Sequence, residues 1–118
     1  MFIDFLPMER RQVLETKIEK IKARIAALGE LRPGSLSQQY NVCGTAGCRC
    51  KADPPQKHGP YHQVSFTHRG RSSSQFVRRE DVARVKRQLR NYERLRSLID
   101  EWIDASIELA RPPKKKNQ

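Results

Sequence analysis

The sequence predicts a mainly α-helical protein with a small β-hairpin, in which two helices form an antiparallel coiled-coil hairpin and a cysteine-rich insert lies at the bend. Apolar residues recur every three or four positions near both ends of the 118-residue chain, which is the helical period. Residues 33–77 hold five of the six glycines, four of the seven prolines and all three cysteines. We therefore divide the chain into an N-terminal helix (1–31), an insert (32–78), a long C-terminal helix (79–111) and a basic tail (112–118).

The first helix is expected from Met8 to Leu28. Its apolar residues are spaced four, three, four and three apart, which indicates a coiled-coil seam rather than the broad face of a globular helix. Gly29 suits the position just past a helix end, and Pro33 prevents the helix from continuing. The seam consists of Leu14, Ile18, Ile21, Ile25 and Leu28.

The insert is expected to contain one β-hairpin. Residues 61–67 alternate in polarity and carry Tyr, Val, Phe and Thr, which favour strands. Residues 68–71 form a turn in which Gly70 can adopt a positive φ, and residues 72–77 return as the second strand. An isolated hairpin is marginally stable in water, so another interaction has to hold it in place.

The second helix is expected from Glu80 to Ala110, because acidic residues suit its first turn and Pro112 disfavours helix at Arg111. Since this helix is longer than the first, an antiparallel hairpin covers only about two thirds of it at roughly 1.5 Å per residue. The apolar remainder predicts a homodimer through the long helix. The tail, 112–118, is expected to be disordered.

Three cysteines and two histidines lie close together in the insert. The cysteine spacing is C-x4-C-x-C, and a histidine follows seven residues after the last cysteine. Three thiolates and one imidazole are a common ligand set for structural zinc, and metal binding would supply folding free energy that so small an insert lacks. Three reduced thiols in a loop, a redox pair and an iron–sulfur site are the alternatives. We predict zinc at Cys43, Cys48, Cys50 and His58.

His62 is the alternative fourth ligand, but it falls on the expected strand beside Tyr61.

The residues of the insert do not indicate a catalytic site. A catalytic zinc site keeps an open position next to an acid or base, and Asp53, beside two prolines, is the only acidic residue here. No cysteine is combined with a histidine and an orienting acid in a recognisable order. The sequence therefore predicts that the protein is not an enzyme.

The charge of the chain indicates a polyanionic partner. The formal net charge is +11, and residues 68–96 hold ten Arg or Lys against three acidic residues. Nine of the ten are arginine, which makes bidentate contacts with phosphate. We predict nucleic-acid binding through the hairpin and one face of the long helix, at Arg69, Arg71, Arg78, Arg79, Lys86, Arg87, Arg90 and Arg94.

The long helix also supports a different interpretation. Its acidic second half continues the basic face with the opposite sign, so an antiparallel second copy would pair the two halves. The alternative function is a homo-oligomeric coiled-coil adaptor that docks a protein partner. The acidic residues are Asp100, Glu101, Asp104 and Glu108.

Two motifs, Cys-Gly-x-x-Gly-Cys-x-Cys at 43–50 and His-Gly-Pro-Tyr at 58–61, resemble a family of short bacterial proteins classed as a domain of unknown function. The resemblance runs from about Leu31 through the long helix, and it favours His58 over His62 as the ligand. Members often carry aromatic residues after the tyrosine, where this chain has His62 and Gln63.

Members of this family are often encoded beside transposases of mobile elements. The resemblance therefore implies a non-enzymatic nucleic-acid-binding accessory protein linked to such elements, with DNA preferred to RNA. It also suggests a transposase as the partner of the alternative adaptor.

Membrane insertion and secretion are not expected. No stretch approaches the roughly 18 apolar residues of a membrane span. The first ten residues lack the cationic start and the apolar run of about 7–15 residues that signal peptides carry. We expect a cytoplasmic protein without a membrane partner.

Overall fold

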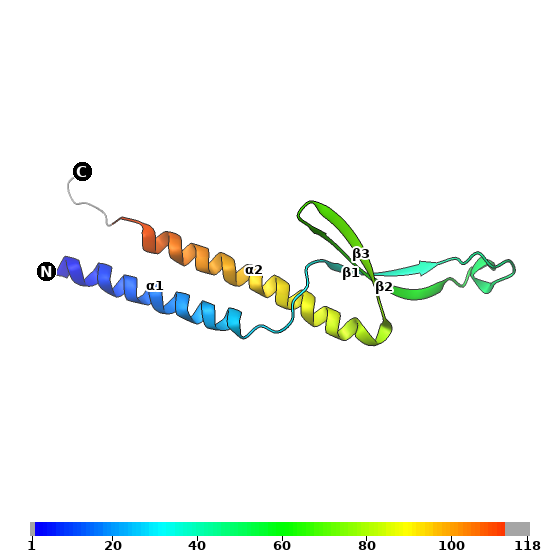
Figure 1. Cartoon of the computed structure of the whole chain (residues 1–118), viewed down its shortest axis with the longest axis horizontal. Coiled ribbons are helices and arrows are strands. Elements are labelled where there is room, and N and C mark those ends of the chain that lie inside the picture. The colour runs from blue at the N-terminus through cyan, green and yellow to red at the C-terminus, as the bar shows by residue number, and fades with distance from the viewer. Residues whose placement is uncertain (1, 113–118) are drawn as a thin grey trace. The chain divides into compact units, whose positions relative to one another are not determined.

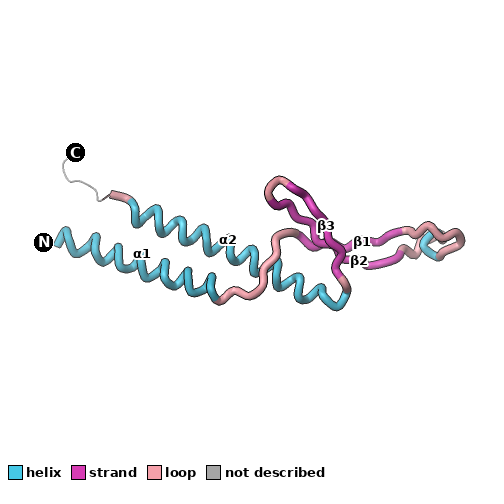
Figure 2. The backbone as a smooth tube through the Cα atoms, viewed as in Figure 1, coloured by secondary structure: helices cyan, strands magenta, loops and turns pink. Residues whose placement is uncertain are grey.

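The computed structural model describes the backbone of residues 2–112 and the side chains of residues 9–112. Two helices, α1 (Phe2–Ala26) and α2 (Val82–Ala110), enclose three strands in chain order, as Figures 1 and 2 show. The strands are β1 (Ser35–Asn41), β2 (His58–His68) and β3 (Arg71–Val77), and short 3-10 turns lie at Arg49–Lys51 and Arg79–Asp81. The chain forms two compact units. One contains α1 and the second half of α2, and the other, residues 30–92, contains the sheet and the first half of α2.

In the first unit the two helices run antiparallel and side by side (Figure 1). Arg10, near the start of α1, forms an ion pair with Glu108, near the end of α2. Lys22, further along α1, lies 5.2 Å from the centre of the Trp102 ring. The predicted contact between two helices is therefore present. Its buried apolar side chains are Ile18, Ile21, Leu98 and Ala105.

The helix boundaries differ from the prediction by a few residues. Helix α1 begins at Phe2 instead of Met8, and it ends at Ala26, two residues before Leu28. The expected start of α2 is a 3-10 turn, and the α-helix proper begins at Val82. The basic tail predicted as disordered lies, except for Pro112, outside the described residues.

The sheet is antiparallel with the order β1-β2-β3, so the predicted hairpin of β2 and β3 is present and carries a further strand. Arg69 and Gly70 form the turn with φ of 51° and 76°. Strand β1 was not predicted, because its sequence SLSQQYN lacks the alternation that marks a half-buried strand. Its conformation comes from pairing with β2, in which Leu36 lies opposite Val64.

One face of the sheet packs on the first half of α2 and forms the core of the second unit. Val64 is fully buried at the centre of this face, and Val85 contributes from the helix. Burying a side chain of this size contributes about 1.5–3 kcal/mol, which explains how the hairpin is held. The sheet, rather than another helix, therefore covers the apolar residues in the first half of α2. The cluster consists of Val64, Val77 and Val85, with Leu36, Phe66, Val82 and Leu89 packed against it.

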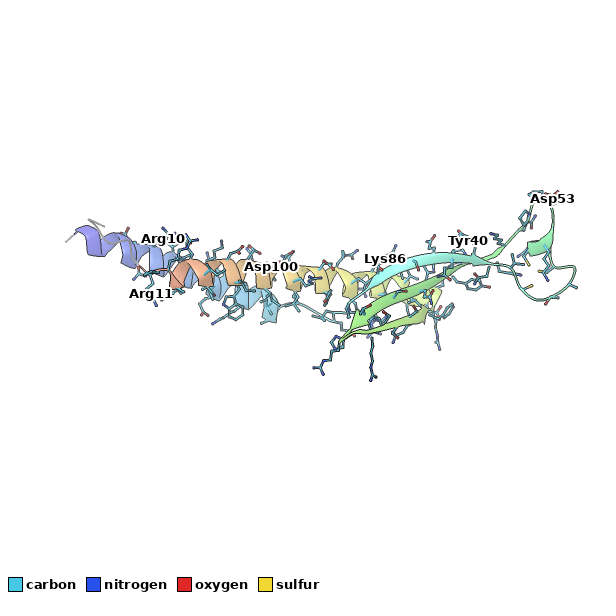
Figure 3. All side chains as sticks on the ribbon, turned by 90° about the horizontal axis from the view of Figure 1, so that it is seen from above. Arg10, Arg11, Tyr40, Asp53, Lys86 and Asp100 are labelled. Atoms are coloured by element: carbon cyan, nitrogen blue, oxygen red, sulfur yellow. The ribbon has the colours of Figure 1, made fainter. Side chains whose placement is uncertain are left out.

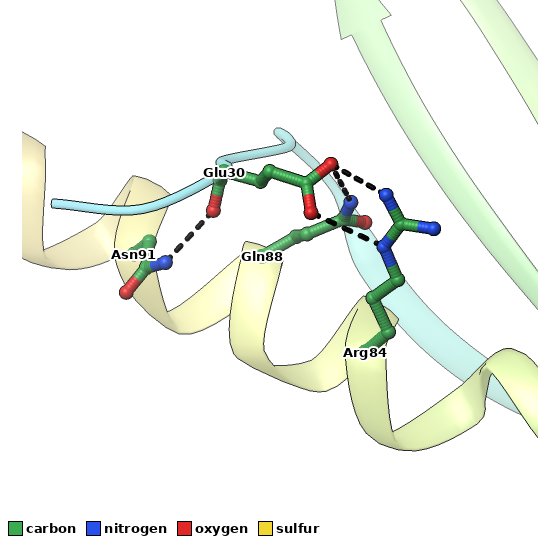
Figure 4. Close-up of polar contacts among 4 residues, drawn as sticks. All are labelled: Glu30, Arg84, Gln88 and Asn91. Atoms are coloured by element: carbon green, nitrogen blue, oxygen red, sulfur yellow. Dashed lines mark hydrogen bonds and ion pairs between the residues drawn. The ribbon is translucent and has the colours of Figure 1, made fainter.

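A polar clamp fastens the segment between α1 and β1 to α2, as Figure 4 shows. The Arg84 guanidinium donates two hydrogen bonds to the Glu30 carboxylate, at 2.7 and 3.2 Å. Asn91 donates to the Glu30 carbonyl at 2.8 Å, and the Arg32 amide donates to the Gln88 carbonyl at 3.1 Å. The hydrogen bonds and positive charge of Arg84 lower the pKa of Glu30. Arg84 is therefore engaged within the protein.

Candidate metal centre and basic surface

The cysteine-rich loop closes where β1 and β2 end their pairing. Asn41, at the end of β1, lies opposite His58, the first residue of β2. Cys43 follows β1 after one residue, while Cys48 and Cys50 lie at the 3-10 turn in the loop. Figure 2 shows this short turn between the two strands. The strand pairing thus brings Cys43 close to His58, which lies 15 positions further along the sequence.

Four potential ligand atoms converge in this loop. The sulfur and nitrogen atoms of Cys43, Cys48, Cys50 and His58 all lie within 4.8 Å of one another. The Cys43 and Cys50 sulfurs are 3.6 Å apart, and the Cys48 sulfur is 3.2 Å from Nε2 of His58. Zinc–sulfur bonds of about 2.3 Å in a tetrahedron separate two sulfurs by about 3.8 Å. The donor set and its spacing therefore fit a tetrahedral zinc ion.

The surroundings of the sulfurs differ. A hydrogen bond from the Thr45 backbone, with further hydrogen bonds from His58 and the other two thiols, lowers the pKa of Cys43 to about 6. Cys50 is almost completely buried, and burial raises the pKa of its thiol. All three cysteines are free thiols. A bound cation would favour the thiolate form of each of them.

Local backbone geometry explains the glycine in His-Gly-Pro. Gly59 has a φ of +137°, and a Cβ atom at this position would lie 2.7 Å from the Gln39 carbonyl oxygen. Only glycine accommodates both the positive φ and this close approach of β1 to β2. Gly59 therefore fixes how the strand begins immediately after His58. Within the loop, the Gln56 amide donates to the Arg49 carbonyl at 3.0 Å and folds the chain back.

Two other residues that were considered for the metal site, His62 and Asp53, do not belong to the converging group. Nε2 of His62 is 3.4 Å from Nε2 of Gln38 across the β1–β2 pair, and His62 is not among the converging ligands. Asp53 belongs to the same loop, labelled in Figure 3, but it is also outside the converging group. Arg49 and Lys51 are exposed beside Cys50, and their positive charges can offset the negative charge of three thiolates.

All eight basic residues predicted to bind nucleic acid are exposed, but they come from different elements. Arg69 lies in the β2–β3 turn, and Arg71 begins β3. Arg78 and Arg79 lie at the connection to α2. The remaining residues, of which Figure 3 labels Lys86, are Lys86, Arg87, Arg90 and Arg94 on α2.

The sheet also exposes an aromatic pair that sequence reasoning missed. The rings of Tyr61 and Phe76 are 6.3 Å apart at an angle of 50°, and these residues are 38% and 68% exposed. In the strand register Phe76 lies opposite Gln63, so both rings lie on the face turned away from the buried Val64. The alternation of residues 61–67 could have revealed that Tyr61 is on the exposed face, because Tyr61 and Val64 must point to opposite faces of a strand.

A three-stranded antiparallel sheet with a Cys3His ligand group, together with two helices in contact, defines a small protein with a candidate metal-binding centre. The chain belongs to the family described as a domain of unknown function, DUF6788, which it matches over residues 11–87. The match begins within α1, earlier than the predicted Leu31, and ends in the first half of α2. Searches of curated proteins and of solved structures found no match.

The family match contains the whole candidate metal centre and ends before the acidic half of α2. The structure also bears on the membrane. Within the described residues, neither helix combines the length and the apolar character needed to cross a bilayer.

Proposed function

We propose that this protein is a non-enzymatic nucleic-acid-binding accessory protein whose sheet is fastened by a zinc ion at Cys43, Cys48, Cys50 and His58. One observation carries the proposal. Between residues 31 and 79, which include the whole sheet and its loop, Asp53 is the only acidic residue, against eight Arg or Lys. A surface so one-sided in charge attracts polyanions.

Zinc would act in this proposal as a structural element. The four converging donors leave no open coordination position for a substrate, which is the pattern of structural sites. The ion would hold the ends of β1 and β2 together and stabilise the loop that presents Arg49 and Lys51. None of the proposed phosphate-binding residues is a zinc ligand, and they lie in other parts of the chain than the cysteine-rich loop.

The arginine side chains supply the phosphate contacts. Because Lys86, Arg90 and Arg94 recur every four residues, they share one face of α2, and Arg87 lies beside them. The four hairpin and connection arginines are exposed as well. Arg84 is not part of this set, since it is bound to Glu30.

The exposed rings of Tyr61 and Phe76 favour a second kind of contact, with unpaired nucleobases. Exposed rings on a sheet surface can stack with nucleobases, and such stacking is worth about 1–3 kcal/mol per base. Tyr61 and Phe76 are surrounded on this face by the neutral hydrogen-bonding side chains of Gln63, Ser65 and Ser74. We include single-stranded DNA beside duplex DNA as a probe for this reason.

The test is fluorescence anisotropy with labelled duplex and single-stranded DNA at several salt concentrations. The affinity should fall steeply with salt, and the double variant Arg90→Glu/Arg94→Glu should lower the salt slope by about 2, or about 1 per lost phosphate contact. The matched control is Lys17→Glu/Lys20→Glu, which makes the same charge change on α1. Equal affinity of the α2 variant and the wild type, or equal losses in both variants, would reject the proposed surface.

The alternative function is an adaptor that docks a protein partner, such as a transposase, through α2. An acidic stretch on α2 that contains exposed isoleucines favours this alternative. In the same experiment the adaptor predicts weak DNA binding at all salt concentrations and no difference between the two double variants. The two functions are therefore separated by one titration.

A further inference from the structure

The second half of α2 carries more apolar surface than its partner helix covers. At 3.6 residues per turn, the apolar residues from Leu95 to Leu109 span an arc of about 200° around the helix axis. A helix packed on one partner needs an apolar stripe of roughly 100°. The excess indicates that this part of α2 has two packing faces.

The structure separates the two faces clearly. The face that includes Leu98 and Ala105 is buried, with exposures of 2% and 4%. The other face forms a stripe of isoleucines four residues apart. We call it the isoleucine stripe: Ile99, Ile103 and Ile107, which are 40%, 49% and 53% exposed.

We infer that the isoleucine stripe of one protomer packs on the same stripe of a second copy of this chain, so that the two helix pairs form a four-helix bundle. Three β-branched apolar side chains in line on a helix have the spacing of bundle and coiled-coil interfaces. A two-fold symmetric contact uses the same patch on both copies, which a single stripe can provide. The first half of α2 is excluded from this contact, since its apolar residues pack on the sheet.

Charge favours a second copy over other occupants of the stripe. Between residues 97 and 110, α2 has four acidic residues and no Arg or Lys, whereas residues 9–26 of α1 have six Arg or Lys and three Glu. A second copy brings a basic α1 that can lie beside the acidic α2 of the first. Asp100, labelled in Figure 3, and Asp104 border the stripe and disfavour nucleic acid or an anionic lipid surface there.

The experiment is sedimentation equilibrium of the full chain without nucleic acid. The wild type should have twice the chain mass of 13.7 kDa, and Ile99→Gln/Ile103→Gln should sediment as a monomer. Val13→Gln is the control, because Val13 is 67% exposed on α1 and lies outside the stripe. Circular dichroism should show unchanged helix content in the variants at the concentration where the wild type dissociates. Ile107→Gln, near the helix end, should weaken association without unfolding.

A monomeric wild type at every concentration overturns the inference and leaves the stripe to a different protein. Equal dimerisation of the wild type and of the variant Ile99→Gln/Ile103→Gln also overturns the inference, because the contact between the two copies then lies elsewhere. Neither outcome affects the proposed nucleic-acid surface, which is read by the anisotropy of the α2 charge variants. The two proposals therefore fail independently.

Discussion

Glu30 shows how one exposed carboxylate can hold a connecting segment in place. It accepts both hydrogen bonds of the Arg84 fork through its side chain, and its carbonyl accepts from Asn91. The fork geometry of arginine suits a carboxylate better than a single ammonium group would. The segment that follows α1 is thereby fastened to α2 without any buried apolar residue of its own.

The clamp predicts a pH-dependent contribution to stability. The pKa of Glu30 is lowered from its ordinary value of 4.5, so its stabilisation is fully present above about pH 4.5 and is lost as the pH falls through the lowered pKa. We expect Glu30→Gln to cause a small loss of stability at pH 7, on the scale of exposed ion pairs. At low pH the wild type and the variant should unfold at the same denaturant concentration.

Urea unfolding followed by circular dichroism at a series of pH values measures this difference. The control is Glu93→Gln, which makes the same charge change at an exposed site on α2, the helix that carries Arg84. A stability difference between wild type and Glu30→Gln that persists unchanged at low pH would show that the carboxylate charge has no part in the clamp.

Residue identity and spacing were informative for the candidate metal ligands and uninformative for the clamp. Cysteines are rare and their close spacing is distinctive, so Cys43, Cys48, Cys50 and His58 could be grouped from the sequence, and the structure brings the same four together. Arg84 looked like any other arginine of the basic region. Its partner, Glu30, is 54 positions away, and no local pattern encodes such a distant ion pair.

At the scale of elements, the sheet packs on the first half of α2 and buries its apolar face there. Val64 is at the centre of β2, the central strand, and it is completely buried between β1, β3 and Val85 of α2. The three strands alone would have one solvated face and one apolar face without a partner. The helix provides that partner, so sheet and helix stabilise each other.

Val64→Ala should therefore destabilise the second unit strongly. Removing two buried carbons and leaving a cavity costs roughly 2 kcal/mol or more. Val13→Ala removes the same atoms at a position that is 67% exposed and should cost less than about 0.5 kcal/mol. Denaturant midpoints of both variants against the wild type measure the effect. Similar small losses in both would mean that the sheet does not depend on this packing.

The pattern of apolar residues predicted the helices and the hairpin but not their partners. We expected the first helix to cover about two thirds of α2, yet the sheet covers the first half of α2. Periodicity reports that a face is apolar, and it carries no information on which element covers that face. Strand β1 was missed for a related reason, since a polar edge strand is specified by its neighbour and not by its own sequence.

At the scale of the whole molecule, the two units carry different surfaces. The unit of residues 30–92 contains the sheet, the candidate metal centre and seven of the eight proposed phosphate-binding residues. The other unit contains the isoleucine stripe and the acidic half of α2. The proposals accordingly assign nucleic-acid binding to the first set and self-association to the second. Net charge alone indicates a polyanionic partner, whereas the positions of the acidic residues along the sequence indicate the division of α2 into a basic and an acidic half.

The central claim is that zinc at the Cys3His group holds the sheet unit in its folded form. Zinc binding and folding are linked, because the ligands come together only in the folded loop. Removing the metal should therefore unfold the loop and lower the stability of the strands that it joins. Cys50→Ser should reproduce the same loss, since it removes the most deeply buried ligand of the group.

The most direct test is a thermal melt of the reduced 118-residue chain before and after treatment with a strong chelator, with the zinc content determined by elemental analysis. We predict one zinc per chain, a large fall in melting temperature on chelation, and no chelator effect on Cys50→Ser. A protein that contains no metal, titrates as three free thiols and melts identically with and without chelator would contradict the account.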